Sequence, residues 1–505
     1  MGTNWLKPRA TLIAAACSLA SACTVGPDFV HPKTQSPATW QDFPITGQAD
    51  SPGGEPNSKP VLAPIEEQWW RQFNDPLLNS LEARVSGNLD IQTAMARLAA
   101  SRAQRKQAVG NGWPAASAEA AYVRQRTSQE GNTRHLIEVI RPPGNVDDIV
   151  RRLGEPYELF QPGFDVSWEL DFWGAERRTV ESANATVARS AATLHDVQLT
   201  IRAELARDYL QWCDLQRQLE IAREDVAASE QMLQLIDRRA QGGLVTDFDV
   251  ASQRARLAEG RANVVQLTEE RKEARNALAL ILGCMPGALE NDLEGVRTIP
   301  AVPSTVPVGI PSEVARRRPD IRAAEARLHA ATADIGVAVA DLYPRIVLTG
   351  SFSIQALRTA DLTDWAARQW SVGPSLSLPL FDAGRRRATV ELRNAEQQEA
   401  AVNYQRTVLR AWHEIDDALS GYAAEQVRNA ELAESVRSSR AALEVANTRY
   451  EHGLTNFLTA LDAQRTLLRT QRDYTDSSTA IATRLVALNK ALGGGWDGDY
   501  QPGPH

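Results

Sequence analysis

Four short segments of the chain alternate between apolar and polar residues. In the clearest of them, which runs from Trp370 to Leu380, apolar side chains occupy every second position. A period of two is that of a β-strand with one apolar and one polar face. The same alternation recurs in three other segments, most weakly from Ala115 to Val123. The pattern predicts strands over about 113–125, 158–172, 343–356 and 369–381.

Between and after these strands, long segments rich in Ala, Glu, Arg and Gln predict helices. From Gly384 to Gly453 there is no proline, and at about 1.5 Å per residue a helix of that length would extend roughly 100 Å. We predict helices over about 88–110, 175–241, 246–283, 318–341, 385–451 and 456–492.

Apolar residues recur along the two longest predicted helices at alternating spacings of three and four residues. This spacing is that of a coiled-coil seam. We interpret the seam as packing of helix on helix, with a binding stripe as the alternative. The residues concerned are Val408, Trp412, Ile415, Leu419 and Tyr422 and, in the first half, Leu194, Val197, Ile201 and Leu205.

Gly243 and Gly453 mark the points where the long helices fold back on themselves. Glycine adopts the left-handed conformation that commonly ends a helix. Cys213 lies 30 residues before Gly243, and Cys284 lies 41 residues after it. If the helices pair about Gly243, the two cysteines are therefore out of register by 41 − 30 = 11 residues. An offset of about 11 helical residues is roughly 16 Å, which exceeds the reach of a disulfide. We predict that both cysteines are free.

The chain contains an internal repeat. Asp90-Ile91 and Pro114 recur as Asp320-Ile321 and Pro344, an offset of 320 − 90 = 230 residues, whereas the glycine Gly243 recurs as Gly453 at an offset of 210. The first half therefore carries an insertion of 20 residues, which we place within Thr127 to Pro156. The predicted division is a first repeat over 65–292, a linker over 293–310, a second repeat over 311–494 and a tail over 495–505.

The N-terminus resembles a bacterial export signal. Lys7 and Arg9 precede an apolar stretch that ends in small residues before Cys23. We predict a signal peptide over 1–22 and lipidation at Cys23, followed by an extended segment over 23–64 that is rich in Pro, Gly and Ser. An ordinary signal peptide with an incidental cysteine, and lipidation at Cys17, remain alternatives. Thr24 in place of an aspartate favours the outer membrane.

Four strands are too few to close a membrane barrel, because the smallest such barrels have about eight. An exported chain with Trp, Phe and Leu on one face of its strands favours a trimer in which three copies share one barrel of twelve strands. The predicted fold class is thus mainly α with a small β part: a duplicated unit of long antiparallel coiled-coil helices and four strands. As a trimer it would form one β-barrel in the outer membrane. A sheet packed on a core of its own is the alternative.

Charge and motifs exclude several other classes of function. The formal net charge of −8 and the isoelectric point near 5.6 give no basic surface for nucleic acid. After the first two dozen residues, no apolar run is long enough for a transmembrane helix.

The sequence has no phosphate-binding loop, zinc-protease motif or nucleophile elbow, and its seven histidines are dispersed. We therefore expect no enzyme activity, no cofactor and no metal site. His452, next to a turn glycine, is more simply a solvated residue than a pH sensor.

Four motifs carry a resemblance to a known family: Cys23 to Phe29, Arg316 to Glu325, Gly373 to Asp382 and Gly453 to Gln464. They resemble the TolC-like outer membrane factor family, specifically its NodT-type efflux lipoprotein branch. The resemblance implies a passive trimeric duct in the outer membrane of a Gram-negative bacterium, with its β-barrel continued by a periplasmic α-helical barrel. It also implies contacts with a periplasmic adaptor at the tips (Gly243, Leu244, Gly453 and Leu454) and an inner-membrane pump, commonly of the resistance-nodulation-division class.

The same resemblance implies a gate near the tips. In the family, a tyrosine and an aspartate at the positions of Tyr450 and Asp249 can form a hydrogen bond across the tips. Carboxylates line the narrowest ring of the family's duct at the positions of Asp462 and Thr459, so we expect an Asp462 ring and leave the second ring in doubt. An arginine that some relatives use as a gate link is replaced by Thr455. Within the barrel, the alternation places Asp165, Glu169 and Asp171 on the polar, lumen-facing side.

The leading hypothesis is therefore the outer membrane channel of a tripartite efflux pump that exports drugs or other small molecules. Two alternatives remain within transport, namely a duct for type I protein secretion and one for metal-ion efflux; four methionines in all disfavour the latter. A periplasmic coiled-coil scaffold lipoprotein is the alternative from another class. The sequence identifies neither the cargo nor the cognate adaptor and pump.

Overall fold

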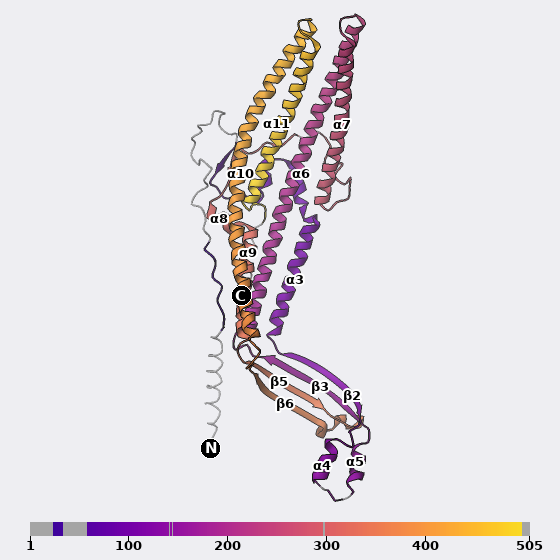
Figure 1. The fold of residues 1–505 in the computed structure, drawn as a ribbon, viewed down its shortest axis with the longest axis vertical. Helices are drawn as coiled ribbons and strands as arrows, with labels where there is room; N and C mark the ends of the chain where they lie inside the picture. The colour runs from indigo at the N-terminus through magenta and orange to yellow at the C-terminus, as the bar shows by residue number, and fades with distance from the viewer. Residues whose placement is uncertain (1–23, 34–57, 141, 144, 296–297, 497–505) are drawn as a thin grey trace. The chain divides into compact units, whose positions relative to one another are not determined.

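A computed structural model describes residues 24–33, 58–140, 142–143, 145–295 and 298–496. Its described residues form two compact units, and each unit draws on both halves of the sequence (Figure 1). The sheet unit contains residues 24–30, 101–186 and 328–399, and the helical unit contains the remainder. The boundaries of the compact units therefore do not coincide with those of the internal repeat, which is a repeat of sequence and of element order.

The two halves contain the same succession of major elements. Helices α6 (Ala175–Gln241) and α10 (Arg385–Glu451) both span 67 residues, and α7 (Asp247–Ile281) and α11 (Phe457–Ala491) both span 35. The other elements of the repeats are α3 (Leu89–Asn111), β2 (Ala115–Gln125) and β3 (Tyr157–Glu169) in the first half, and α9 (Pro319–Ala340), β5 (Arg345–Ile354) and β6 (Arg368–Ser377) in the second.

Shorter elements flank or interrupt the repeats. A two-stranded parallel sheet joins β1 (Lys59–Val61) to β4 (Thr305–Pro307). The remaining short elements are η1 (Trp69–Phe73), α2 (Pro76–Ala83), η2 (Val85–Gly87), α8 (Pro311–Arg317), η3 (Thr359–Thr363) and η4 (Trp365–Ala367), together with α4 (Asn132–Ile140) and α5 (Val146–Leu153) inside the predicted insertion.

The sheet unit contains one antiparallel sheet in the order β2-β3-β5-β6 (Figure 1). The register pairs Phe164 with Phe352 and Phe352 with Trp370, so these three aromatic residues lie in one row across the sheet. Side chains on the same face of a sheet pack against their cross-strand neighbours. This apolar face is exposed: Trp370 retains 73% of its accessible surface. The opposite face carries Ser, Thr, Asp and Glu, as the alternation predicted.

Asp171 does not line the polar face of the sheet, contrary to the sequence-based expectation. Strand β3 ends at Glu169, and the Asp171 carboxylate accepts hydrogen bonds from the backbone amides of Glu176 (3.2 Å) and Arg177 (3.0 Å). The first amides of a helix have no partner within the helix, so a carboxylate there satisfies them. Its negative charge also interacts favourably with the positive end of the helix dipole. Asp171 is thus a cap of α6. Asp382 likewise accepts from the amide of Arg386 (3.3 Å) in α10.

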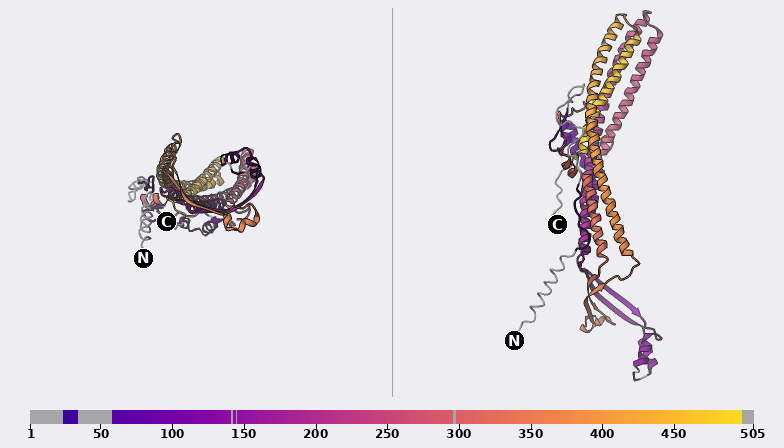
Figure 2. Two further views of the ribbon diagram at one scale, coloured as in Figure 1. Left: turned by 90° about the horizontal axis from the view of Figure 1, so that it is seen from below. Right: turned by 60° about the vertical axis from the view of Figure 1, so that its left-hand side comes forward.

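The helical unit is held together by one large apolar core. Trp69, Tyr209 and Ile415 are fully buried in it. The hairpins α6–α7 and α10–α11 lie side by side (Figures 1 and 2). The predicted seam of α10 packs on other helices, since Val408, Ile415, Leu419 and Tyr422 are buried and Trp412 is partly so.

Polar contacts also join the two hairpins. The Thr479 hydroxyl in α11 donates to Asp214 in α6 at 2.9 Å, and the Gln218 amide donates to both Asp214 and Asp476 at 2.8 Å. Neither Cys213 nor Cys284 forms a disulfide, as predicted. Among the helices that the structure describes, none combines the length and the apolar character needed to cross a bilayer.

Glu82 is a charged residue within this core. Only 2% of it is exposed, and neither carboxylate oxygen has a hydrogen-bond partner in the described part of the chain. Burial raises the pKa of Glu82 to about 8, and the nearby Arg202 opposes the shift only in part. Because the folded state holds this proton more tightly than the unfolded state, the free energy of unfolding should fall as pH rises from about 4.5 to about 8.

We predict that Glu82→Gln stabilises the protein in alkaline solution. The amide keeps the shape of the side chain and removes the cost of a buried charge, which is on the order of 5 kcal/mol at pH 9 for this change in pKa. Melting curves in detergent should show a higher Tm than the unmodified protein at pH 9 and a smaller difference at pH 5. The exposed Glu431→Gln serves as the control. Equal pH dependence of Glu82→Gln and the unmodified protein would contradict the prediction.

Candidate functional site

The candidate site lies where the two long hairpins of the helical unit turn. Gly243 and Gly453 adopt φ values of +71° and +73°, which side chains with a Cβ rarely adopt. The amide of Leu244 donates to the carbonyl of Arg239 (2.9 Å), and that of Leu454 donates to the carbonyl of Arg449 (2.8 Å). These bonds span six residues and close a Schellman motif at the end of each helix. The glycines therefore end α6 and α10 as predicted.

The returning helices begin with side-chain caps. Thr246 and Asp249 form a capping box at α7: the Asp249 carboxylate accepts from the Thr246 amide (3.1 Å) and hydroxyl (2.8 Å). At α11, the amide of Thr459 donates to the Asn456 side chain at 3.1 Å. Leu244 and Leu454, between the two helices of each hairpin, are 77% and 69% exposed. Each tip therefore presents a leucine to its surroundings.

Tyr450 and Asp249 do not bond to each other within this chain. Tyr450 is only 4% exposed, and its hydroxyl has no hydrogen-bond partner in the described residues. The Asp249 carboxylate serves the capping box instead. The hydrogen bond between these two positions therefore stays a prediction about the assembly.

Arg239 makes the contact between the tips that sequence reasoning missed. Its guanidinium donates to the carbonyls of Tyr450 (3.1 Å) and Glu451 (2.8 Å), at the end of α10. Its central carbon also lies 4.6 Å from the centroid of the Tyr450 ring. A cation on the last carbonyls of a helix satisfies unpaired acceptors and interacts favourably with the helix dipole, and a cation over an aromatic ring adds to the attraction.

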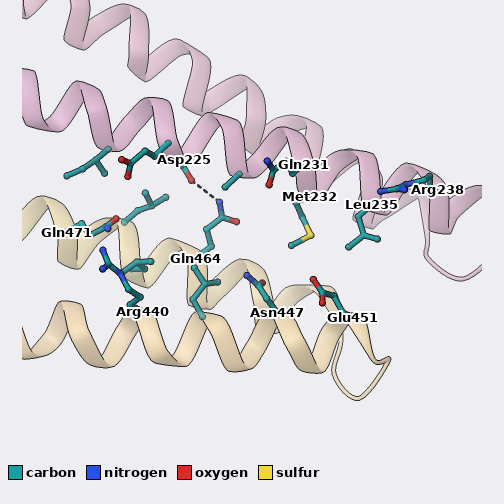
Figure 3. A pocket seen from close by; sticks show the side chains of 16 residues that line it. Asp225, Gln231, Met232, Leu235, Arg238, Arg440, Asn447, Glu451, Gln464 and Gln471 are labelled. Carbon is teal, nitrogen blue, oxygen red and sulfur yellow. Dashed lines mark hydrogen bonds between the residues drawn. The ribbon is translucent and has the colours of Figure 1, made fainter. Parts of the chain in front are cut away.

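A small apolar cluster lies beneath this contact. Ile236, Tyr450, Phe457, Ala460 and Leu461 are its buried members. Farther from the tips, the Gln464 amide donates to Asp225 at 2.8 Å, which joins α11 to α6. A groove of about 580 Å³ opens between these helices, and its lining includes Met232, Gln464 and Glu451 (Figure 3). Arg239 thus joins the two hairpins at the tips, and Gln464, within the lining of the groove, joins them across it (Figure 3).

Asp462 and Thr459 are exposed on α11, and the single chain does not bring Asp462 near another copy of itself. The expected carboxylate ring at Asp462 therefore stays a prediction about the assembly. Cys23 lies outside the described residues, as do the first 22 positions. Among the described residues, no group of three or more His, Cys, Asp or Glu side chains is arranged to hold a metal ion.

The chain is similar to known proteins over most of its length. The family described as "Outer membrane efflux protein" matches residues 81–284 and 310–494. Outer membrane protein OprJ of Pseudomonas aeruginosa is 31% identical over 488 residues, or 94% of each chain. The pyoverdine export outer membrane protein OpmQ of the same species is 30% identical over 491 residues, which cover 96% of this chain and 97% of OpmQ. The solved structure of the outer-membrane channel OprN is 36% identical, with a TM-score of 0.82, and covers 94% of this chain and 100% of OprN. The similarity thus includes both repeats and the tips.

We predict that Arg239→Ala loosens the end of α10. The substitution removes two charge-assisted hydrogen bonds, and local opening of the last turn should become about tenfold more frequent or more. Hydrogen exchange at the amides of Gly453 and Leu454, which donate to the last carbonyls of α10, should accelerate accordingly. Arg238→Ala is the matched control, because the Arg238 side chain donates within its own helix. Equal exchange in the two variants would exclude Arg239 as the link between the tips.

Proposed function

We infer the function from the premise that this chain belongs to the outer membrane efflux protein family. It is the outer membrane channel component of a tripartite efflux pump in a Gram-negative bacterium. The observation that carries this conclusion is the four-stranded sheet, whose apolar face is exposed and whose outer strands β2 and β6 have no second partner among the described residues. Such a sheet is suited to contact lipid with one face and water with the other.

A trimer satisfies the open edges of this sheet. In a bilayer, every backbone amide and carbonyl must find a partner, because lipid offers none. Pairing β2 of one copy with β6 of the next would close the sheet after three copies, and trimeric channels are the form of this family. We propose that the polar face, with Asp165 and Glu169, then lines the lumen.

The remaining pump components are proposed from the tips. Leu244 and Leu454 are exposed apolar side chains at the tips, and the groove behind them has a mixed lining of apolar, charged and amide side chains. This combination suits a helical periplasmic adaptor. Through this adaptor, the channel would connect to an inner-membrane pump of the resistance-nodulation-division class. The pump supplies the energy, and the channel provides a passive path.

The cargo is proposed to be small organic molecules. Similar proteins are described by different cargoes: OpmQ by pyoverdine export, and TtgI of Pseudomonas putida by toluene efflux. One channel architecture thus serves chemically different molecules, which suggests that cargo selection is made by other parts of the pump.

We propose that the gate is closed at the tips by two features. The first is the Arg239 link and the small apolar cluster beneath it. The second is a ring of three Asp462 carboxylates around the axis of the trimer. Like charges close together attract cations and repel one another, so the ring would narrow the passage for anions and bind multivalent cations. Asp249, Tyr450 and Thr459 surround this region and would change partners when it opens.

Planar bilayer recordings test both the channel and the ring. The extracted protein should run as a trimer in mild detergent and conduct ions. Asp462→Ala should raise the single-channel conductance or weaken block by multivalent cations, because it removes one carboxylate from each of three chains. Asp247→Ala, an exposed carboxylate at the start of α7, is the control. A trimer that conducts but does not distinguish Asp462→Ala from the control would remove Asp462 from the constriction, and a silent monomer would refute the channel.

We further propose that Cys23 carries the lipid anchor. Cys23→Ser should abolish incorporation of radiolabelled palmitate and leave some trimer, because the sheet itself contacts the bilayer. Retention of the label in Cys23→Ser would place the lipid elsewhere, with Cys17 as the nearest alternative.

A further inference from the structure

The residues that follow Cys23 form an extended strap on the sheet unit. We call Thr24 to Val30 the N-terminal strap. The amide of Val25 donates to the carbonyl of Trp173 at 3.1 Å. The guanidinium of Arg178 donates to the carbonyls of Val25 (3.3 Å) and Gly26 (3.4 Å). The strap thus takes its backbone partners from the start of α6.

Arg178 is the main side chain that holds the strap. Only 4% of it is exposed, although it is charged and lies in the first turn of a helix. Its guanidinium pairs with Asp28 of the strap at 2.6 Å and with Glu181 at 2.7 Å. A buried cation requires partners for its donors, and the strap supplies three of them. Arg178 is therefore satisfied only when the strap is in place.

The aromatic residue of the strap is fixed by a second contact. The ring of Phe29 stacks on His329 of α9, with centroids 4.2 Å apart and the planes 12° from parallel. The other edge of His329 contacts Glu181, since its Nε2 lies 2.9 Å from the carboxylate. Glu181 therefore contacts both Arg178 and His329. The strap is held at Asp28 and at Phe29 through a connected set of side chains.

Three glycines allow the strap to approach this closely. A Cβ on Gly26 would lie 2.5 Å from the Cα of Gly336 in α9, and a Cβ on Gly174 would lie 2.7 Å from Thr24 Cγ2. A Cβ on Gly336 would lie 2.7 Å from the Arg178 side chain. Gly26 and Gly174 also have φ values of +92° and +83°. The surface under the strap is therefore shaped for this segment of the chain.

The strap begins beside a belt of aromatic residues at one end of the sheet. The indole of Trp173 donates to the carbonyl of Pro344 at 2.8 Å, and its ring stacks on Tyr343 at 4.7 Å. The indole of Trp168 donates to the carbonyl of Gly112 at 3.0 Å. Tryptophan and tyrosine concentrate where a barrel passes from hydrocarbon to head groups. Trp168, Trp173 and Tyr343 are therefore residues of the types that barrels place at the membrane surface.

We propose that the N-terminal strap sets the depth of the lipid anchor, and that Arg178 is its positioning residue. The proposal rests on the proposed lipidation of Cys23. Thr24 contacts Gly174, the residue that follows Trp173 in the chain. Because consecutive Cα atoms are only about 3.8 Å apart, this contact lies next to Trp173. The docked strap therefore holds Thr24, the residue next to the proposed lipidation site, at the level of the aromatic belt. An anchor held in register with the sheet adds to the sheet's own hold on the bilayer.

Depth-dependent fluorescence quenching in the full-length, lipidated trimer tests the proposal. The exposed Pro27 is replaced by cysteine and labelled, with Cys213 and Cys284 replaced by alanine, and the label is quenched by nitroxide lipids at stated depths. With Arg178 intact, quenching should be sharpest near the head groups. Arg178→Ala should reduce the ratio of docked to free strap about tenfold or more and broaden the profile. Arg178→Lys should give an intermediate result, and Arg177→Ala, which loses a contact to Asp171 instead, should give none.

A second variant and a second readout keep the test decisive. Gly26→Val changes a residue of the strap and no residue of the helices or the sheet. Its side chain would clash with Gly336 of α9, so it should broaden the profile as Arg178→Ala does. A bismaleimide cross-link between Phe29→Cys and His329→Cys reports docking directly and should be lost with either variant. Unchanged cross-linking, or lost cross-linking with an unchanged quenching profile, would overturn the proposal. Incorporation of radiolabelled palmitate separates the lipidation of Cys23 from the positioning role of Arg178. If Arg178→Ala retains the palmitate and its quenching profile broadens, both hypotheses are supported. If the unmodified protein incorporates no palmitate, the lipidation is refuted and, with it, the positioning role.

Discussion

The unpaired edges of a four-stranded sheet are the constraint on which the rest of the molecule depends. One face of the sheet is apolar and exposed, and both outer strands offer amides and carbonyls that the described residues leave without partners. In water such an edge invites aggregation, and in lipid it is untenable. Closure by other copies of the chain removes both problems. The long helices then need not cover the sheet, which explains why each strand pair leads into a 67-residue helix rather than into a packing layer.

The passage from strand to helix is built in the same way in both halves. An aspartate, Asp171 or Asp382, accepts hydrogen bonds from the first amides of the helix that follows. A glycine with a positive φ, Gly174 or Gly384, turns the chain just before the helix starts. In the first half this turn serves a second purpose, because the missing side chain of Gly174 leaves room for Thr24. The connection that starts the long helix is thus also the place where the N-terminal strap begins.

The sequence predicted what is periodic and missed what depends on distant contacts. The bounds predicted for the two longest helices, 175–241 and 385–451, are those of the structure, because the absence of proline and the terminal glycines define them locally. The alternation also assigned the apolar face of the sheet. It failed at Asp171, where the period continued but a helix amide competed for the carboxylate. Arg239 could not be found, because its partners lie more than 200 positions away and are backbone carbonyls, which have no sequence signature.

The tips and the core of the helical unit differ in how much burial holds them together. The core buries Trp69, Tyr209 and many aliphatic side chains, whereas the tip cluster buries five residues and includes a tyrosine hydroxyl without a partner. An unsatisfied buried hydroxyl costs about 1–3 kcal/mol, which offsets much of what so small a cluster contributes. The Arg239 hydrogen bonds therefore form a large share of the energy that keeps the tips together. In the gate that we propose, opening that exposes Tyr450 would let its hydroxyl find a partner, so the closed and open arrangements would lie close in free energy. A gate that a partner protein must shift needs this near balance, since a ligand moves an equilibrium only by its differential affinity for the two states.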